Sequence, residues 1–383
     1  MDFEFTEEQV QLRNSLRSYL TDKAAFADMR RTSRAEPGWD PEIWRDFATR
    51  LGIVGTAIGT PAGGLGGGAV DIMVIMEELG ERLVPVPFLE TAIIGAALLE
   101  DGGNREAELQ AIVTGEARYA LAWAEPGGRY NPAHVELEAV RTARGWSLKG
   151  VKSVVAAAPW ATHLLVTART AGESRERGGV SLFLVDARHA QLFMSVYPTI
   201  DGRRAADVSF NDVEVDRDAI VGDEGLAIDA IEAALDTGIA AIGAEAVGVM
   251  RRLVQDTIDY CKTRRQFGKP LSDFQALQHR MVDMFMHLEM ATSAVYLATL
   301  NLDAPPLERA KACSAAKITI GQACRFIGQN AVQLHGGMGM TDELAIGHYF
   351  KRATVIESEF GSTDYHLARF ASLSGQAQPG LLA

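Results

Sequence analysis

The sequence predicts an α+β protein in which a helical segment is followed by a β-segment and then by four long helices. Apolar residues recur at helical spacing in roughly the first hundred residues and again after Gly225. Between these stretches, short apolar runs alternate with glycine, proline, asparagine and aspartate, which is typical of antiparallel strands. We therefore expect an N-terminal α-helical domain over residues 1–116, a middle β-barrel-like domain over 117–224 and a C-terminal four-helix bundle domain over 225–383.

Composition narrows the class of protein. The chain has 383 residues, of which 47% are hydrophobic, and its net charge is −13, so nucleic acid and anionic membranes are poor partners for it. Its three cysteines form no CxxC pair and fit reduced thiols. The first residues lack the apolar run of a signal peptide, and no stretch has the roughly 18 unbroken apolar residues of a membrane span. We expect a soluble cytoplasmic protein.

The N-terminal segment contains two clear helix starts. Residues 6–9 read Thr-Glu-Glu-Gln, which fits a capping box at the start of a helical pattern over about 6–32, and Asp40 followed by Pro41 fits the start of a second helix. The glycine-rich stretch 63–68 could be mistaken for a dinucleotide-binding turn. We interpret it as a plain loop, because the following helix leads to Pro85 and Pro87, which disfavour a central parallel strand.

The two later segments follow the same periodicity rules. The strands expected in the middle segment lie at 119–123, 135–140, 146–155, 163–167, 180–185 and 206–215. Long helices are expected at 226–262, 270–302, 306–332 and 341–372. One apolar stripe in the second of these helices should face the core: Phe274, Leu277, Met281, Met284, Phe285 and Leu288.

Two motifs of the C-terminal segment carry donors that suit an anion. The first, Tyr260–His279, places Arg264, Arg265 and Lys269 in one turn, and the second, Gln333–Gly339, places two adjacent glycines directly after a histidine. Guanidinium groups and the backbone N–H groups of a glycine turn both bind phosphate oxygens. Together the motifs suggest a diphosphate site, although either one alone could be a solvated surface loop.

The order of segments and both motifs resemble the acyl-CoA dehydrogenase family over essentially the full length. The pairing of Arg264–Gly268 and Phe274-Gln275 with Gln333–Gly339 is specific to that family. Further similar stretches are Ala124–Gly127, Trp146–Lys152 and Asp201–Val208.

This resemblance implies an enzyme that uses FAD to oxidise an acyl-CoA thioester to the trans-2-enoyl-CoA. In the family a carboxylate removes the α-proton, and electrons pass to an electron-transfer flavoprotein. It also implies which residues hold the ADP portion of FAD, reaching across a subunit interface to the flavin of the neighbouring chain. By this criterion the cofactor-binding residues are Arg264, Gln266, Phe267, Phe274, Gln275, Gln333, Leu334, Gly336 and Gly337.

The catalytic base of the family is missing from both of its usual positions. The resemblance aligns Phe360 with the commoner glutamate and Gly238 with the alternative one. Neither side chain can remove a proton. No catalytic residue is therefore expected in the usual positions, and Glu359, next to Phe360, is the nearest carboxylate.

The residues that would contact the flavin ring also depart from the family. Ala124 replaces a hydroxyl residue before Glu-Pro-Gly, and Gly128–Tyr130 replaces Gly-Ser-Asp. Val154–Ala156 replaces Trp-Ile-Thr, whose threonine normally bonds the flavin. Loss of these donors should weaken flavin binding and the tuning of its reduction potential.

This combination resembles the small subunits of heterotetrameric α₂β₂ acyl-CoA dehydrogenases. The residue sequence of Gly347–Arg352, followed by Phe360-Gly361, is similar to that of the small subunit of pimeloyl-CoA dehydrogenase. Bacterial steroid side-chain dehydrogenases share the α₂β₂ arrangement. We therefore expect a half-site subunit that completes the FAD site of a homologous partner, in fatty acid or steroid catabolism. The acyl group itself is open between a dicarboxylyl and a steroid type.

Three alternatives remain at this point. A self-sufficient homotetrameric dehydrogenase would need a displaced base, for which Glu359, Asp236 and Glu245 are candidates. A flavin monooxygenase of the same fold needs no α-proton base, but would leave the ADP-binding residues unused. A catalytically silent structural subunit would bind no cofactor.

A metal site is not expected. Four histidines of the C-terminal segment show no HxxxH or HExxH spacing: His279, His335, His348 and His366. Of these, only His335 is expected near a ligand, because it lies within the glycine motif.

Overall fold

The computed structural model describes residues 5–376, and these form two compact units built from separated stretches of chain. One unit takes residues 5–30, 69–84 and 239–376 and is almost entirely helical. The other takes residues 31–68 and 85–238 and contains the large β-sheet. The chain is thus α+β, as predicted. The helical N-terminal segment contributes to both units.

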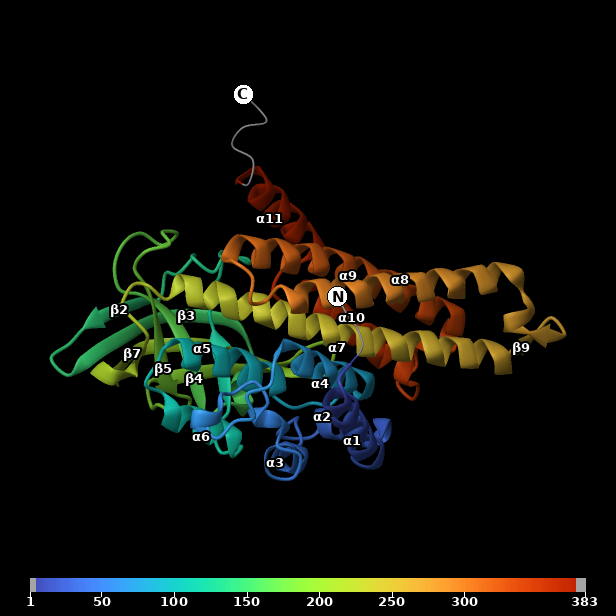
Figure 1. Cartoon of the computed structure of the whole chain (residues 1–383), viewed down its shortest axis with the longest axis horizontal. Coiled ribbons are helices and arrows are strands. Elements are labelled where there is room, and N and C mark those ends of the chain that lie inside the picture. Colours follow the sequence, from blue (N-terminus) through green and yellow to red (C-terminus); the bar gives the residue numbers. More distant parts are fainter. Residues whose placement is uncertain (1–4, 377–383) are drawn as a thin grey trace. The chain divides into compact units, whose positions relative to one another are not determined.

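In the first unit, three helices pack around the long helix α9 (Pro306–His335). Its helices are α1 (Glu7–Lys23), α4 (Ala69–Arg82), α8 (Gln275–Leu300), α9 (Pro306–His335), α10 (Ala345–Ser358), α11 (Thr363–Gln376), the start of α2 (Phe26–Arg34) and most of α7 (Ile228–Thr263). Helix α9 contacts α8, α10 and α11, and Figure 1 shows α8 and α9 running side by side. Glycines permit this packing, because a Cβ at Gly328 would lie 2.8 Å from the Phe350 ring.

Two predicted helices are each divided in the structure. Residues 6–32 form α1 and α2, which are separated at Ala24, while the predicted capping box at Thr6 and Gln9 is present. Residues 341–372 form α10 and α11, because Gly361 takes a φ of 121° between them. Such a backbone conformation does not continue a right-handed helix.

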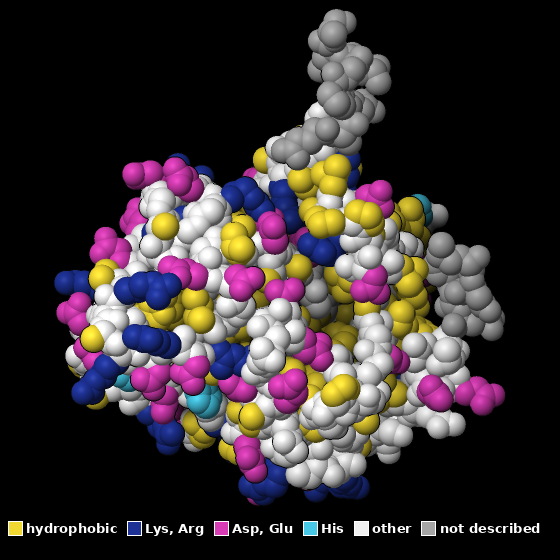
Figure 2. Space-filling view, turned by 60° about the vertical axis from the view of Figure 1, so that its left-hand side comes forward, with side chains coloured by type: hydrophobic (Ala, Val, Ile, Leu, Met, Phe, Trp, Pro, Cys, Tyr) yellow, Lys and Arg dark blue, Asp and Glu magenta, His cyan; other side chains and the backbone are white. Residues whose placement is uncertain are grey.

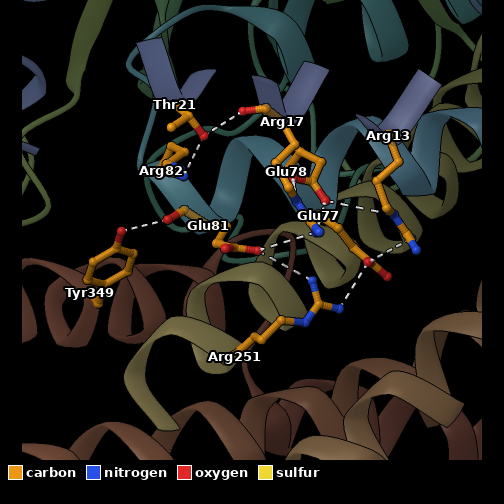
Figure 3. A network of polar contacts seen from close by, with 9 residues as sticks. All are labelled: Arg13, Arg17, Thr21, Glu77, Glu78, Glu81, Arg82, Arg251 and Tyr349. Carbon is orange, nitrogen blue, oxygen red and sulfur yellow. Dashed lines mark hydrogen bonds and ion pairs between the residues drawn. The ribbon is translucent and has the colours of Figure 1, made fainter. Parts of the chain in front are cut away.

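A polar network ties the distant stretches of the first unit together (Figure 3). The buried carboxylates Glu77 and Glu78 on α4 accept hydrogen bonds from Arg13 and Arg17 on α1, at 3.1 Å and 2.6 Å. Arg251 on α7 also donates to Glu77, at 3.1 Å. Since a buried carboxylate is costly unless paired, these arginines fix α1 and α7 against α4.

The second unit is organised around an eight-stranded sheet of order β6-β7-β3-β2-β4-β5-β8, with β1 paired to β4. The strands are β1 (Tyr119–Ala122), β2 (Glu138–Arg141), β3 (Gly145–Ala156), β4 (His163–Arg169), β5 (Val180–Asp186), β6 (Leu192–Pro198), β7 (Arg204–Asp216) and β8 (Ile220–Val221). The pairs are antiparallel except β1 and β2 with β4. All six predicted strand regions overlap these strands, whereas β6 and β8 were not predicted. Trp146, Phe183 and Phe210 lie in the buried core of this sheet.

Short helices precede the sheet in the second unit. They are α3 (Pro41–Thr49), η1 (Ile53–Gly55), η2 (Thr60–Ala62), the π-helix η3 (Leu89–Gly95), α5 (Ala96–Asp101) and α6 (Glu106–Val113). Asp40 caps α3 and Pro41 is its first residue, as predicted. The first strand of the described chain is β1, so the glycine-rich stretch 63–68 follows no strand and is a loop.

Helix α7 is long and apolar enough to cross a membrane by length and composition alone. However, 89% of its most apolar window is buried inside the protein, as in the core helix of a soluble protein. The face shown in Figure 2 carries lysine and arginine side chains interspersed with aspartate and glutamate, with no large basic cluster. The cytoplasmic location stays a prediction.

Candidate functional site

The first motif forms a β-hairpin between α7 and α8. Its strands are β9 (Arg265–Gln266) and β10 (Lys269–Pro270), which pair antiparallel. Phe267 and Gly268 connect them with φ values of 52° and 81°, and two successive positive φ values are the geometry of the tightest hairpin turns. The turn leaves the Phe267 ring 91% exposed. An aromatic ring this exposed is available to stack on a ligand.

The three cations of this hairpin have different surroundings. Arg265 donates to the Gly268 carbonyl at 3.3 Å, and Lys269 donates to the Asp273 carbonyl at 3.3 Å while its ammonium lies 4.3 Å from the Phe274 ring centre. Among residues 5–376, the exposed guanidinium of Arg264 has no hydrogen-bond or ion-pair partner. Arg264 is therefore the cation of this group that can bind an anion without breaking an existing contact.

The second motif ends α9 with a glycine turn. Gly336 has a φ of 60° and a ψ of −143°, a combination that is essentially restricted to glycine. Both Gly336 and Gly337 are exposed, and a Cβ at either position would meet no atom within 4 Å. A ligand can therefore approach this backbone closely, as the sequence suggested.

One aromatic contact joins the two motifs. The ring of Tyr260 near the end of α7 stacks on the imidazole of His335 at the end of α9, with centroids 4.2 Å apart. The Tyr260 hydroxyl also donates to the His335 carbonyl at 3.4 Å. Burial lowers the pKa of His335, so its imidazole is neutral at pH 7.

The other residues expected at the ADP moiety divide by exposure. Gln266, Gln275 and Gln333 are exposed, and Phe274 is half-buried with its ring 6.3 Å from that of Phe267. Leu334 is buried, so only its backbone is positioned to face a ligand. The exposed groups combine amides, aromatic rings and one cation, which is the chemistry that an adenosine diphosphate needs.

The turn that carries Phe360 is held from two sides by buried side chains. Lys317 on α9 donates to the carbonyls of Ile356, Glu357 and Gly361 at 2.8–2.9 Å, and burial lowers its pKa to about 8. His366 on α11 contacts the Phe360 carbonyl at 3.0 Å. The turn is therefore rigid, with a side chain at position 360 that cannot accept a proton.

The alternative carboxylates are accounted for in different ways. Glu245 forms a buried bidentate pair with Arg352, with both distances 2.7 Å, and Glu359 lies 3.3 Å from the same guanidinium. Asp236 and Gly238 are both buried in α7. Arg352 thus pairs with two of the three carboxylates that are candidates for a displaced base, Glu245 and Glu359.

The equivalents of the flavin-contacting residues lie in the β-sheet unit and offer few donors. Val154 has a φ of 53° and a side chain that is 62% exposed, and its N–H already donates to Asp207 at 2.9 Å. Ala124 and Ala156 have no polar side-chain atom at all, and the Ala124 carbonyl already accepts from the Ser153 N–H. The side chains at these three positions are apolar where a flavin ring would need hydrogen bonds, whereas the stretch Gly128–Tyr130 brings an exposed arginine and a tyrosine.

A buried ion pair lies behind this surface. Lys152 donates to Glu125 at 2.5 Å and to Thr167 at 2.7 Å, and burial lowers its pKa to about 8 against the opposing effect of Glu125. Ligand atoms of Glu125, His134 and Glu136 lie within 4.8 Å of one another, a spacing that a metal could bridge. Because the Lys152 ammonium already neutralises Glu125, a metal ion at this group would have to compete with Lys152 for that carboxylate.

Sequence patterns did not reveal the buried residues that organise these regions. Tyr260, Lys317 and Arg352 act through contacts between distant helices, and Arg169 binds the carbonyls of Ala133, Val135, Ser174, Glu176 and Gly178. For Lys317, Arg352 and Arg169, the one local indication in the sequence is a lysine or arginine within an apolar helical or strand pattern. The partner of such a residue lies in another part of the chain, so the local sequence does not predict it.

Three family models match successive parts of the chain. They are the acyl-CoA dehydrogenase N-terminal domain over residues 6–116, the middle domain over 120–213 and the C-terminal domain over 225–372. Among curated relatives, the acyl-CoA dehydrogenase IpdE2 of Mycolicibacterium smegmatis is 29% identical over 350 residues, covering 91% of this chain and 93% of the relative. The caffeyl-CoA reductase-Etf complex subunit CarC of Acetobacterium woodii is 28% identical over 328 residues, covering 84% and 86%.

Solved structures are similar over nearly the whole length. The Tcur3481-Tcur3483 steroid ACAD is 30% identical with a TM-score of 0.87, covering 98% of this chain and 99% of the other. The ChsE4-ChsE5 complex from Mycobacterium tuberculosis is 24% identical with a TM-score of 0.89 and 100% coverage of both chains, a likeness that concerns the fold alone.

Proposed function

This chain belongs to the acyl-CoA dehydrogenase family, and we propose that it is the half-site subunit of an α₂β₂ complex. In this role it completes an FAD site that is seated in a homologous partner subunit, and it contributes no catalytic base. When bound, FAD supplies the hydride acceptor for the α,β-dehydrogenation of an acyl-CoA thioester. The complex then delivers its electrons to an electron-transfer flavoprotein.

The observation that supports this proposal most is the contrast between the two halves of the site. The ADP half fits the group: within residues 5–376 the Arg264 guanidinium has no partner, Phe267 is exposed, and Gly336 and Gly337 leave open space above the backbone. These groups would hold the diphosphate and adenine of FAD. A surface with these groups would have no ligand to hold in a chain that binds no cofactor.

The flavin-ring half does not fit the group. Val154, Ala124 and Ala156 provide no side-chain donor, and the N–H of Val154 is already bonded to Asp207. The Phe360 turn is rigid and offers no carboxylate, while Glu359 and Glu245 are paired with Arg352. We propose that the proton-abstracting group and the residues that hold the flavin ring come from another subunit.

An exposed apolar face on α8 supplies a surface for that partner. Phe285 and Met286 are 52% and 55% exposed, although the sequence pattern predicted that Phe285 would be buried. Exposed apolar residues continue along the same helix: Val282, Met290, Leu297 and Leu300. A row of exposed apolar side chains along one helix is typical of an interface, and α8 is the helix that follows the hairpin after one short turn.

The names of the relatives agree with a multi-subunit setting. CarC is named as a subunit of a complex with Etf, and the 30% identical steroid ACAD structure names two components. A steroid acyl-CoA is the substrate class that this one structure favours. No feature of the described residues favours the monooxygenase or the silent-subunit alternative over the half-site role.

Mass and FAD content test the proposal. We expect the chain purified alone to be free of flavin. Co-purified with an acyl-CoA dehydrogenase encoded beside it, the chain should form a tetramer with two FAD per four chains, the ratio that the α₂β₂ arrangement requires. One FAD per chain in a homotetramer that acyl-CoA reduces would establish the self-sufficient alternative instead.

A further inference from the structure

We infer that Tyr260 is a positioning residue that holds the two halves of the ADP clamp at a fixed separation. The inference rests on the proposed function, because the clamp is taken to be Arg264 on one side and the Gly336-Gly337 turn on the other. It assigns to Tyr260 a role in FAD affinity that requires no contact with FAD. Tyr260, Arg264 and the glycine turn all belong to the helical unit.

The backbone of Tyr260 organises the first half. Its carbonyl, in the last turn of α7, accepts the N–H of Arg264 at 2.8 Å and the hydroxyl of Thr263 at 3.1 Å. The carbonyl of Arg264 in turn accepts the N–H of Leu271 at 2.9 Å, which closes the base of the hairpin. The point from which the Arg264 side chain starts is therefore set by Tyr260.

The side chain of Tyr260 organises the second half. Its ring covers the imidazole of His335 at 4.2 Å with an interplanar angle of 25°, and its hydroxyl reaches the His335 carbonyl. The His335 Nδ1 contacts the Ala331 carbonyl at 2.8 Å, so the imidazole is fixed against its own helix as well. His335 is the residue directly before Gly336, and its position determines where the glycine turn begins.

A single side chain therefore joins two backbone elements that come from separate parts of the sequence. Groups that bind a diphosphate from two sides gain affinity when their spacing is fixed before the ligand arrives, because less freedom is lost on binding. Without the Tyr260 ring, the end of α9 would lose its packing against α7 at this point. The hairpin and the glycine turn would then move independently, and FAD would have to order them.

The test is the affinity of the assembled complex for FAD, measured by titrating flavin-depleted complex and following flavin fluorescence. Tyr260→Leu removes the ring and should raise the Kd for FAD about tenfold. Tyr260→Phe keeps the stack and loses only the long hydrogen bond, so it should restore the Kd to within about twofold of the unaltered complex. The matched control is Tyr365→Leu, which removes a half-buried tyrosine whose ring packs edge-on against the imidazole of His366 in the same unit, outside both motifs.

A purely structural role would lower thermal stability equally in both leucine variants and leave the FAD Kd alike. That outcome, or an unchanged Kd in Tyr260→Leu, would overturn the inference. If Tyr260→Leu fails to assemble, His335→Leu breaks the same stack from α9 and should raise the Kd similarly, with no further rise when combined with Tyr260→Phe. Arg264→Ala separates the premise from the inference: an unchanged FAD content there defeats the proposed function, whereas its loss combined with an unchanged Kd in Tyr260→Leu defeats only the positioning role.

Discussion

Arg352 and Glu245 form a bidentate ion pair in the helical unit, with Nε to Oε1 and Nη2 to Oε2 both at 2.7 Å and both side chains buried. The remaining side of the same guanidinium lies 3.3 Å from Glu359. A carboxylate held by an arginine has little basicity, because the cation stabilises its charged form. This relationship argues against a base role for Glu359, the carboxylate nearest to the usual base position, and gives the first prediction.

Glu359→Gln should leave the acyl-CoA dehydrogenase activity of the assembled complex within about twofold, since Arg352 retains its stronger pair with Glu245 and no proton passes through Glu359. The measurement is the steady-state rate with an artificial electron acceptor. A loss of activity by a factor of about 10³ or more would identify Glu359 as a general base and support the self-sufficient alternative.

Phe285→Glu should prevent assembly with the partner while the isolated chain keeps its fold. A charge in the middle of an apolar interface must be desolvated without a partner, whereas on a free surface it is solvated. Light scattering of the co-expressed proteins measures this. The control is Phe193→Glu on β6, where the ring is similarly exposed, and an assembly defect in both variants, or in neither, would contradict the assignment of α8 to the interface.

Lys152→Met should lower the free energy of unfolding by about 3–5 kcal/mol, because it leaves the buried Glu125 carboxylate without its cation. Adding Glu125→Gln should recover a large part of this loss, since the remaining amide carries no charge. Chemical denaturation of the single and double variants gives the values. Equal losses that simply add in the double variant would show that the two residues are not coupled.

His366 should make the protein less stable in acid. Burial, the main cause, together with the nearby Lys317 and Arg369, lowers its pKa to about 3, while the Phe360 carbonyl opposes this shift. Below its ordinary pKa near 6.5 the unfolded chain binds a proton that the folded chain excludes, so stability falls as pH decreases, by up to about 1.4 kcal/mol per pH unit from this group. His366→Gln should reduce the slope of unfolding free energy between about pH 4 and 6, and an unchanged slope would show that another group titrates.

Local chemistry explains which parts of the fold could be predicted. The capping box at Thr6, the start of α3 at Asp40 and the ends of α7 and α9 are signalled by residues within a few positions of the feature itself. Strand β6 was missed because Phe193 and Val196 are exposed while Leu192 is buried, so the run shows no regular alternation. The apolar stripe of α8 was assigned wholly to the core because periodicity cannot distinguish a core face from an interface, and Phe285 proved to be exposed.

The site divides in the same way. Arg264, Gly336 and Gly337 could be named from the sequence because the pairing of their two motifs resembles the acyl-CoA dehydrogenase family, although either motif alone could be a surface loop. Their common location depends on the stacking of Tyr260 on His335, a contact between residues that are far apart in the chain. The neutralisation of Glu245 and Glu359 by Arg352 is also a product of helix packing, and no pattern within α7 or α10 indicates it.

The most direct test of the half-site account is the FAD content of the complex assembled with Arg264→Ala in this chain and an unaltered partner. The account predicts that the tetramer still forms, that its FAD is lost or greatly reduced, and that Lys262→Ala, which removes a neighbouring exposed cation in the last turn of α7, keeps its FAD. An Arg264→Ala tetramer with its full FAD content would contradict the claim that this chain completes the partner's site.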